Sequence, residues 1–228
     1  MPAPLNAVIL ISGRGSNMQA IIDQARAGAL PVQICAVISD RPGAPGLARA
    51  REAGIPAEAV DPAAHGDKAA FEAALRARID HYRPGLVVLA GFMRVLSRDF
   101  VEHYAGRLLN IHPSLLPAFP GLDTHARALA AGVREHGASV HFVTPEVDAG
   151  PVIIQARVPV SPDDTPETLA ARVLKEEHRI YPTAIRWFAE GRLQIRDGQV
   201  LLDGRRHPDQ GLAQGASAAR ETNPTAST

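Results

Sequence analysis

The hydrophobic and polar positions repeat with two different periods up to about residue 136. Short apolar runs rich in β-branched residues predict buried strands, and most are followed by segments whose apolar residues recur at helical spacing. The expected strands lie at 6–11, 32–38, 56–60, 85–90 and 107–111. The expected helices lie at 17–27, 44–53 and 68–82, and Asp67 is placed to cap the last of them.

Repeated strand–helix–strand units predict a Rossmann-like α/β fold with a doubly wound, mostly parallel sheet. The pattern then changes, because two strands at 138–143 and 152–160 are joined by a connection rich in Pro, Asp and Gly. Since no helix separates them, we expect a C-terminal antiparallel hairpin with a long loop. A long helix is predicted at 166–189, and Asp197-Gly198 between two short apolar runs indicates a further hairpin.

Composition narrows the class of protein. The 228 residues include 24 Lys plus Arg and 24 Asp plus Glu, so no basic excess points to nucleic acid or a membrane surface. The sequence has no apolar run of roughly 18 residues and no signal-peptide pattern at its start. The single cysteine suits a reducing compartment, so we expect a cytoplasmic protein. We expect one domain over 1–204 and a disordered, apolar-poor tail at 205–228.

A glycine-rich segment at 13–17 (Gly-Arg-Gly-Ser-Asn) directly follows the first strand and opens a helix. Glycines allow the backbone to approach a ligand closely, and the free N–H groups of a helix N-terminus favour an anion. A dinucleotide fingerprint would need a third glycine where Met18 stands, although Asp40 after the second strand could imitate the ribose-binding acid. The segment therefore favours a single phosphate, with dinucleotide binding and a plain tight turn as alternatives.

Asn110 and His112 stand two residues apart at the end of a predicted strand. Period two places both side chains on one face, and ligands of open α/β sheets bind beyond the carboxyl ends of strands. An amide and a titratable imidazole are therefore expected to converge on a substrate. A lone histidine can also be a structural residue that a backbone carbonyl satisfies.

Asp148 precedes Ala-Gly-Pro in a loop, where an aspartate is usually a turn former. It matters for chemistry only if the fold brings it to His112, where it could orient the ring or favour its charged form. No Cys or His spacing matches a zinc site, so we expect no metal.

Five segments resemble the folate-dependent phosphoribosylglycinamide formyltransferases in content, order and spacing. They lie at 11–17, 89–97, 109–117, 139–143 and 148–151, and the similarity runs from about residue 6 to 204. The resemblance implies transfer of a formyl group from 10-formyltetrahydrofolate, the co-substrate, to the amine of glycinamide ribonucleotide in purine biosynthesis. The implied partners are these two small molecules, with the chain acting as a monomer or a homodimer.

The resemblance also implies a role for particular residues. The catalytic positions are Asn110, His112 and Asp148, of which the first two would stabilise the oxyanion. The nucleotide phosphate would be held by Gly15, Ser16 and Asn17, and the ribose by Glu177. The implied folate contacts are Lys68, Met93, Arg94, Val95, Leu96, Asn110, Thr144, Pro145, Glu146, Val147 and Asp148.

Two positions depart from the pattern of the family. Lys68 stands where some relatives have Arg as a folate contact, and Asp123 stands where some have His.

Another formyltransferase or formyltetrahydrofolate hydrolase on the same core is the alternative function. Methionyl-tRNA formyltransferase has an extra C-terminal domain and the hydrolase an extra N-terminal one, and we expect neither here. A non-enzymatic sugar-phosphate-binding module and a nicotinamide oxidoreductase are more distant alternatives.

Overall fold

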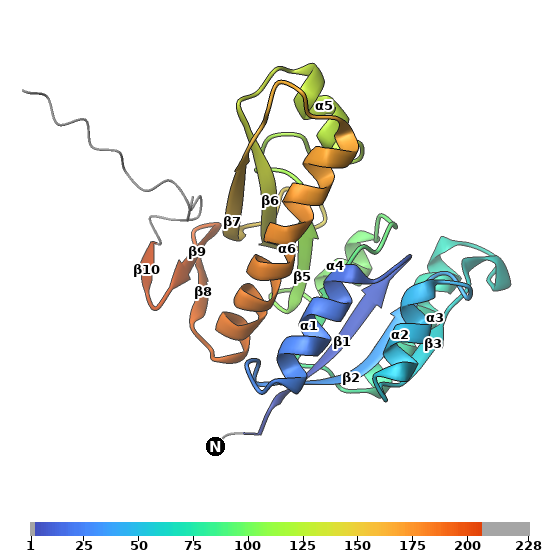
Figure 1. Cartoon of the computed structure of the whole chain (residues 1–228). Helices are drawn as coiled ribbons and strands as arrows, with labels where there is room; N and C mark the ends of the chain where they lie inside the picture. Colours follow the sequence, from blue (N-terminus) through green and yellow to red (C-terminus); the bar gives the residue numbers. More distant parts are fainter. Residues whose placement is uncertain (1–2, 207–228) are drawn as a thin grey trace, which may run out of the picture.

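The computed structural model describes residues 3–206, and its main sheet has seven strands in the order β3-β2-β1-β4-β5-β6-β7 (Figure 1). The strands are β1 (Leu5–Ile11), β2 (Val32–Ser39), β3 (Ala57–Ala59), β4 (Leu86–Leu89), β5 (Leu108–His112), β6 (Glu135–Phe142) and β7 (Val152–Pro159). The first five strands pair in parallel, whereas β6 runs antiparallel to both β5 and β7. The predicted antiparallel hairpin is therefore confirmed.

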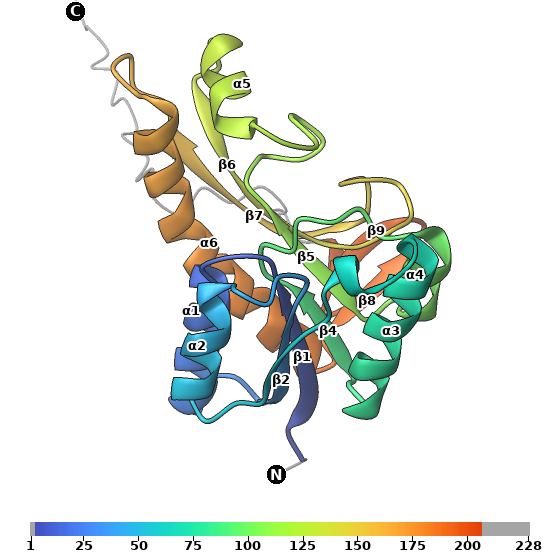
Figure 2. The same ribbon diagram turned by 90° about the vertical axis from the view of Figure 1, so that its right-hand side faces the viewer.

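Helices cover both faces of this sheet (Figure 2). They are α1 (Ser16–Arg26), α2 (Pro45–Glu52), η1 (Pro62–Ala64), α3 (Lys68–His81), α4 (Arg98–His103), α5 (Thr124–Ala130) and α6 (Pro166–Ala189). Side chains alternate along β1, so Ile9 packs in the core formed with α1, α2 and α6, while Leu10 packs in the core formed with α3 and α4. The predicted doubly wound α/β fold is confirmed. Within residues 3–206 no helix is long and apolar enough to cross a membrane.

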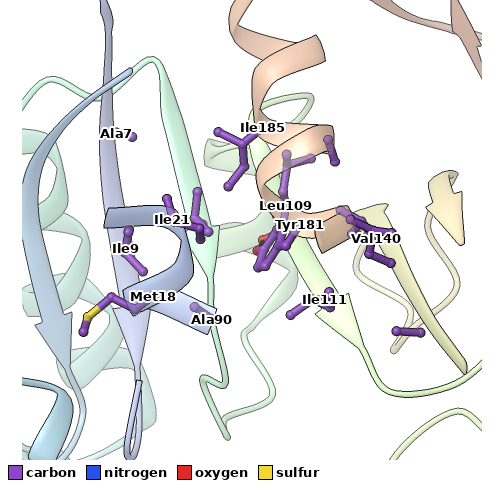
Figure 3. Packing of buried hydrophobic residues seen from close by; sticks show 14 of the residues in the cluster. Ala7, Ile9, Met18, Ile21, Ala90, Leu109, Ile111, Val140, Tyr181 and Ile185 are labelled. Carbon is purple, nitrogen blue, oxygen red and sulfur yellow. Dashed lines mark hydrogen bonds between the residues drawn. The ribbon is translucent and has the colours of Figure 1, made fainter. Parts of the chain in front are cut away.

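The larger core holds α1 and the long helix α6 against the sheet (Figure 3). Met18 and Ile21 project from α1, and Tyr181 projects from α6; all three are buried. The Tyr181 hydroxyl lies 2.9 Å from the carbonyl oxygen of Leu89 and 3.0 Å from that of Leu109. This contact fixes α6 across the junction of β4 and β5, and so brings its middle turns close to the carboxyl ends of the strands.

A second, small sheet follows α6 and corrects one prediction. Its strands are β8 (Leu193–Arg196), β9 (Gln199–Leu202) and β10 (Arg205–Arg206). The disordered tail was expected to begin at residue 205, but residues 205–206 pair with β9. The reason is a second Asp-Gly turn, in which Asp203 (φ 53°) and Gly204 (φ 74°) adopt left-handed conformations that reverse the chain. The remainder of the predicted tail, 207–228, lies outside the described residues.

The sequence pattern missed the three short helices η1, α4 and α5 and the start of one strand. Helix α4 has six residues and α5 has seven, too few for a helical period to repeat. Strand β6 begins at Glu135, earlier than the predicted 138, because polar His136 and Gly137 hide the apolar pattern. A Cβ on Gly137 would lie 1.8 Å from the carbonyl oxygen of Ala156, so only glycine allows β6 to approach β7 there.

Candidate active site

A cavity of about 530 Å³ opens beyond the carboxyl ends of β4 and β5. Three irregular segments line it, at 91–96, 121–123 and 143–148. This is the position that parallel α/β sheets favour for ligands. Asn110 and His112 line the cavity from one face of β5, which confirms the inference from period two.

Asp148 reaches His112 although 36 residues separate them in the chain. Its Oδ2 lies 3.4 Å from Nδ1 of His112, and the Nε2 of the same ring lies 2.9 Å from the carbonyl oxygen of Phe119. Nε2 therefore has a backbone acceptor, and Nδ1 lies within ion-pair distance of Asp148 at the cavity. Asp148 Oδ2 also accepts a hydrogen bond of 2.8 Å from the backbone N–H of Gly121. The carboxylate therefore joins the imidazole to the loop that covers the cavity.

His141 belongs to this cluster, and no local pattern of the sequence predicted its place there. Strand register places it opposite Asn110, with His141 Nε2 at 3.1 Å from Asn110 Nδ2. Its Nδ1 lies 2.9 Å from the carbonyl oxygen of Phe142. Burial lowers the pKa of His141, which favours a neutral ring that donates from Nδ1 and accepts the amide N–H at Nε2. His141 thus fixes the orientation of the Asn110 amide; only the pairing of β5 with β6 could have revealed this.

The loop after β5 is anchored by buried polar side chains on β6 and β7. Ser139 Oγ donates to the carbonyl oxygen of Ser114 at 2.6 Å and accepts from the N–H of Leu116 at 3.0 Å. Gln155 Nε2 donates to the carbonyl oxygen of Leu116 at 2.8 Å. These contacts hold the loop that supplies the Phe119 carbonyl to His112.

The glycine-rich turn lies at the start of α1, as predicted. Gly15 has φ 69°, and a Cβ there would lie 2.9 Å from Cε of Met18 and 3.2 Å from Cα of Gly46. A non-glycine residue would therefore be strained at this position. Met18 is fully buried at the position where a dinucleotide fingerprint would need its third glycine. This observation favours the interpretation of the turn as a site for a single anion.

Asn17 and Glu177 meet beside this turn from distant parts of the chain. Asn17 Nδ2 donates to Glu177 Oε2 at 2.6 Å, and both side chains are buried. Burial raises the pKa of Glu177, and the hydrogen bond from Asn17 partly opposes that shift. Because Glu177 lies on α6, the long helix brings an acceptor carboxylate to the predicted phosphate turn.

The cavity has an apolar rim. Met93, Val95, Leu122 and Val147 are among the large hydrophobic side chains that remain exposed, and all four line the cavity. Exposed apolar side chains gathered around one opening mark a binding site for a ligand with a flat or apolar part. Leu122 was not among the predicted contacts, because its loop carries no apolar pattern.

Most predicted folate contacts line this cavity, but Lys68 lies apart. The segments 93–96 and 144–148 line it, as does Asn110. Lys68 instead lines an adjoining cavity of about 370 Å³, which shares the segment 93–95 with the first. The Lys68 ammonium is exposed and lies 3.7 Å from Glu72 Oε1. The structure therefore places Lys68 at the outer end of the cleft, away from His112. Asp123, the other departure from the family, lines the main cavity.

Comparison with known proteins agrees with this geometry. Residues 5–185 match the model of a family described as formyl transferase. The chain belongs to the formyl transferase family. Among its relatives in this family, the phosphoribosylglycinamide formyltransferase of Escherichia coli is 54% identical over 92% of this chain and 99% of its own. The phosphoribosylglycinamide formyltransferase structure from Coxiella burnetii superimposes with a TM-score of 0.85 at 55% identity, covering 89% of this chain and 95% of that one.

The same fold also occurs in a relative with a different named activity. A formyltetrahydrofolate deformylase from Pseudomonas syringae has a TM-score of 0.81 at 28% identity, covering 87% of this chain and 66% of that one. The fold therefore accommodates both of the activities that these names give, and it does not by itself distinguish them.

Proposed function

We propose that this chain transfers the formyl group of 10-formyltetrahydrofolate to the amine of phosphoribosylglycinamide, a step of purine biosynthesis. The observation that carries the proposal is that Asn110, His112 and Asp148 converge at one cavity. The 54% identity to the E. coli phosphoribosylglycinamide formyltransferase over nearly the whole chain supports the choice of substrates. Residues 1–204 act as a single formyltransferase domain.

The nucleotide binds between α1 and α6. Backbone N–H groups of Gly15, Ser16 and Asn17 hold the phosphate, because the first turn of α1 leaves them without helical partners. Glu177 accepts hydrogen bonds from the ribose hydroxyls, and Asn17 fixes its carboxylate in place. Both groups border the end of β1, which directs the amine of the nucleotide toward β5.

The folate lies in the main cavity. Its pterin and aryl rings pack against the segment 93–96 and the loop 144–148, whose Met93, Val95 and Val147 side chains are exposed. Burial of this apolar rim on binding supplies affinity of about 25 cal/mol per Å² of apolar surface removed from water. Arg94 and Lys68 at the outer end of the cleft attract the carboxylates of the folate tail.

The chemistry is acyl transfer through a tetrahedral intermediate. The amine nitrogen attacks the formyl carbon, a C–N bond forms and the carbonyl oxygen becomes an oxyanion. The second N–H of the Asn110 amide and a protonated His112 donate to that oxygen. The bond between the formyl carbon and N10 of the folate then breaks, and a proton passes from the amine nitrogen to N10, through His112 or an ordered water.

Asp148 and His141 position the two donors. Asp148 faces Nδ1 of His112 and stabilises the ring when it is charged. His141 accepts one N–H of Asn110 and leaves the other directed to substrate. Preorganised donors of this kind cost no rearrangement when charge develops in the transition state.

The experiment that tests this function offers competing acceptors. Purified protein is given 10-formyltetrahydrofolate with phosphoribosylglycinamide, initiator methionyl-tRNA or buffer alone, and release of tetrahydrofolate and formylation of each acceptor are followed. We expect rapid formylation of phosphoribosylglycinamide, and a loss on the order of 10²-fold or more in a His112→Asn variant. Release at the same rate without any acceptor would contradict the proposal and identify the hydrolase instead, which the likeness to the deformylase makes the second candidate.

A further inference from the structure

Ser12 stands between the two proposed substrate subsites. It follows β1, immediately precedes the glycine-rich turn and is only 2% exposed. Its backbone N–H donates to the carbonyl oxygen of Gly91 at 3.0 Å. Its Oγ accepts from the backbone N–H of Met93 at 2.8 Å. One residue therefore bonds, from backbone and side chain, to the segment that lines the folate cavity.

The segment 91–97 has no regular structure and depends on side-chain anchors. Arg94 Nε donates to Asp40 Oδ2 at 2.8 Å, and the N–H of Ser97 donates to Glu72 Oε1 at 2.9 Å. Glu72 lies on α3, and Asp40 directly follows β2, whose last residue Ser39 pairs with Ile11. The Ser12 contacts differ because they join the segment to the turn itself.

The glycine-rich turn is held equally closely on its other side. The N–H of Gly46 donates to the carbonyl oxygen of Gly13 at 3.0 Å. A Cβ on Gly46 would lie 2.4 Å from Cδ1 of Ile11 and 2.9 Å from that same Gly13 oxygen. Helix α2 packs tightly against one side of the turn. A shift of the turn toward a bound phosphate is therefore transmitted to the segment 91–97 on its other side, through Ser12.

We propose that Ser12 is a positioning residue that couples the nucleotide and folate subsites, so that each ligand strengthens the binding of the other. The inference rests on the proposed function. A phosphate that orders the turn also fixes Ser12, and Ser12 fixes the N–H of Met93 at the wall of the folate cavity. The reverse path has the same strength, since coupling between two binding sites is reciprocal.

The test measures this coupling with ligands that cannot react. Tetrahydrofolate carries no formyl group, so it can be bound together with phosphoribosylglycinamide at equilibrium. Titration calorimetry gives the Kd of the nucleotide with and without saturating tetrahydrofolate. For the unaltered protein we expect the folate to tighten nucleotide binding by at least about 5-fold, the lower end of ordinary coupling. In Ser12→Ala, where the Met93 N–H loses its acceptor, we expect the ratio to fall to near one.

Ser97→Ala is the matched control. It removes a hydroxyl from the same segment, but Ser97 contacts Glu72 and the start of α4 and not the glycine-rich turn. We expect it to weaken tetrahydrofolate binding while the coupling ratio persists. Melting temperatures of both variants verify that each remains folded.

The outcomes separate the inference from the proposed function. An unaltered protein that binds neither ligand contradicts the proposed function. An unaltered protein that binds both without mutual effect overturns the role of Ser12, as does a Ser12→Ala variant that keeps the full coupling ratio. Equal loss of coupling in Ser97→Ala also overturns it, because the effect would then belong to the whole segment.

Discussion

Asp148 Oδ2 lies 3.4 Å from Nδ1 of His112, and the same oxygen accepts the backbone N–H of Gly121 at 2.8 Å. One carboxylate thus faces the proposed catalytic ring and also holds the loop that closes over the cavity. The aspartate has φ 52° and its side chain is 11% exposed, so it is both a turn residue and a partner of His112. The two roles can be separated by mutation.

Asp148→Asn should reduce turnover by something on the order of 10²–10⁴-fold, the usual scale for losing positioned acid–base help. The amide keeps an oxygen that can accept from Gly121, but it removes the negative charge that stabilises a charged His112. Steady-state kinetics should show the loss mainly in kcat, with the KM values for both substrates nearly kept. Normal turnover with a lowered melting temperature would show that Asp148 acts only on the loop.

Gly15→Val should weaken nucleotide binding by about 10-fold or more, because a left-handed backbone alone costs a non-glycine residue ~1–2 kcal/mol. The added Cβ would also meet Met18 and Gly46 at 2.9 and 3.2 Å. Calorimetry of each ligand alone should show little change in tetrahydrofolate binding. Gly43→Ala is the control, since nothing lies within 4 Å of its Cβ and it should bind both ligands normally. Equal loss of both ligands in Gly15→Val would make the turn a general structural element.

Glu177→Gln should make the free protein more stable at neutral pH and impair nucleotide binding. Burial raises the pKa of Glu177 above its ordinary value, so the folded state binds this proton more tightly than the unfolded state does. The free energy of unfolding therefore falls as pH rises from the ordinary pKa of a glutamate through the raised pKa of Glu177. A neutral glutamine avoids that loss. Urea unfolding at pH 4 and pH 7.5 checks the sign, and calorimetry checks the affinity. A variant less stable than the parent at pH 7.5 would contradict the prediction.

His136→Leu should flatten the dependence of stability on pH under acid conditions. Burial, aided by the neighbouring His125 and His112, lowers the pKa of His136 from 6.5 to about 4. Its neutral form therefore contributes stability that is fully present above pH 6.5 and is lost as pH falls toward about 4. At 1.36 kcal/mol per pKa unit the loss amounts to about 3 kcal/mol.

The measurement for His136 is the free energy of unfolding in urea at several pH values between 7.5 and 4.5. The leucine variant should lose less stability than the parent over this range. His81→Gln, a change at an exposed histidine, should follow the parent curve. Parallel curves for the parent and His136→Leu would show that His136 does not drive the acid sensitivity.

The sequence by itself predicted the main-sheet strands and the longer helices in their order along the chain, and two parts of the candidate site. Asn110 and His112 share one face because side chains alternate strictly along any strand, whatever its neighbours. The glycine-rich turn was predictable because its left-handed Gly15 and the helix that follows are local properties of a few adjacent residues. The second Asp-Gly turn, at Asp203, is a local signal of the same kind.

Only the tertiary structure decided which distant residues meet. Asp148 reaches His112 because β6 returns the chain antiparallel to β5 before the loop that carries Asp148, and His141 faces Asn110 because of one particular register. Shifting that register by one residue would turn every side chain of the strand to the other face, and no local pattern reports the pairing. Asn17 meets Glu177 across 160 residues for the same reason, since the packing of α6 on the sheet, and not the spacing of residues, sets that contact.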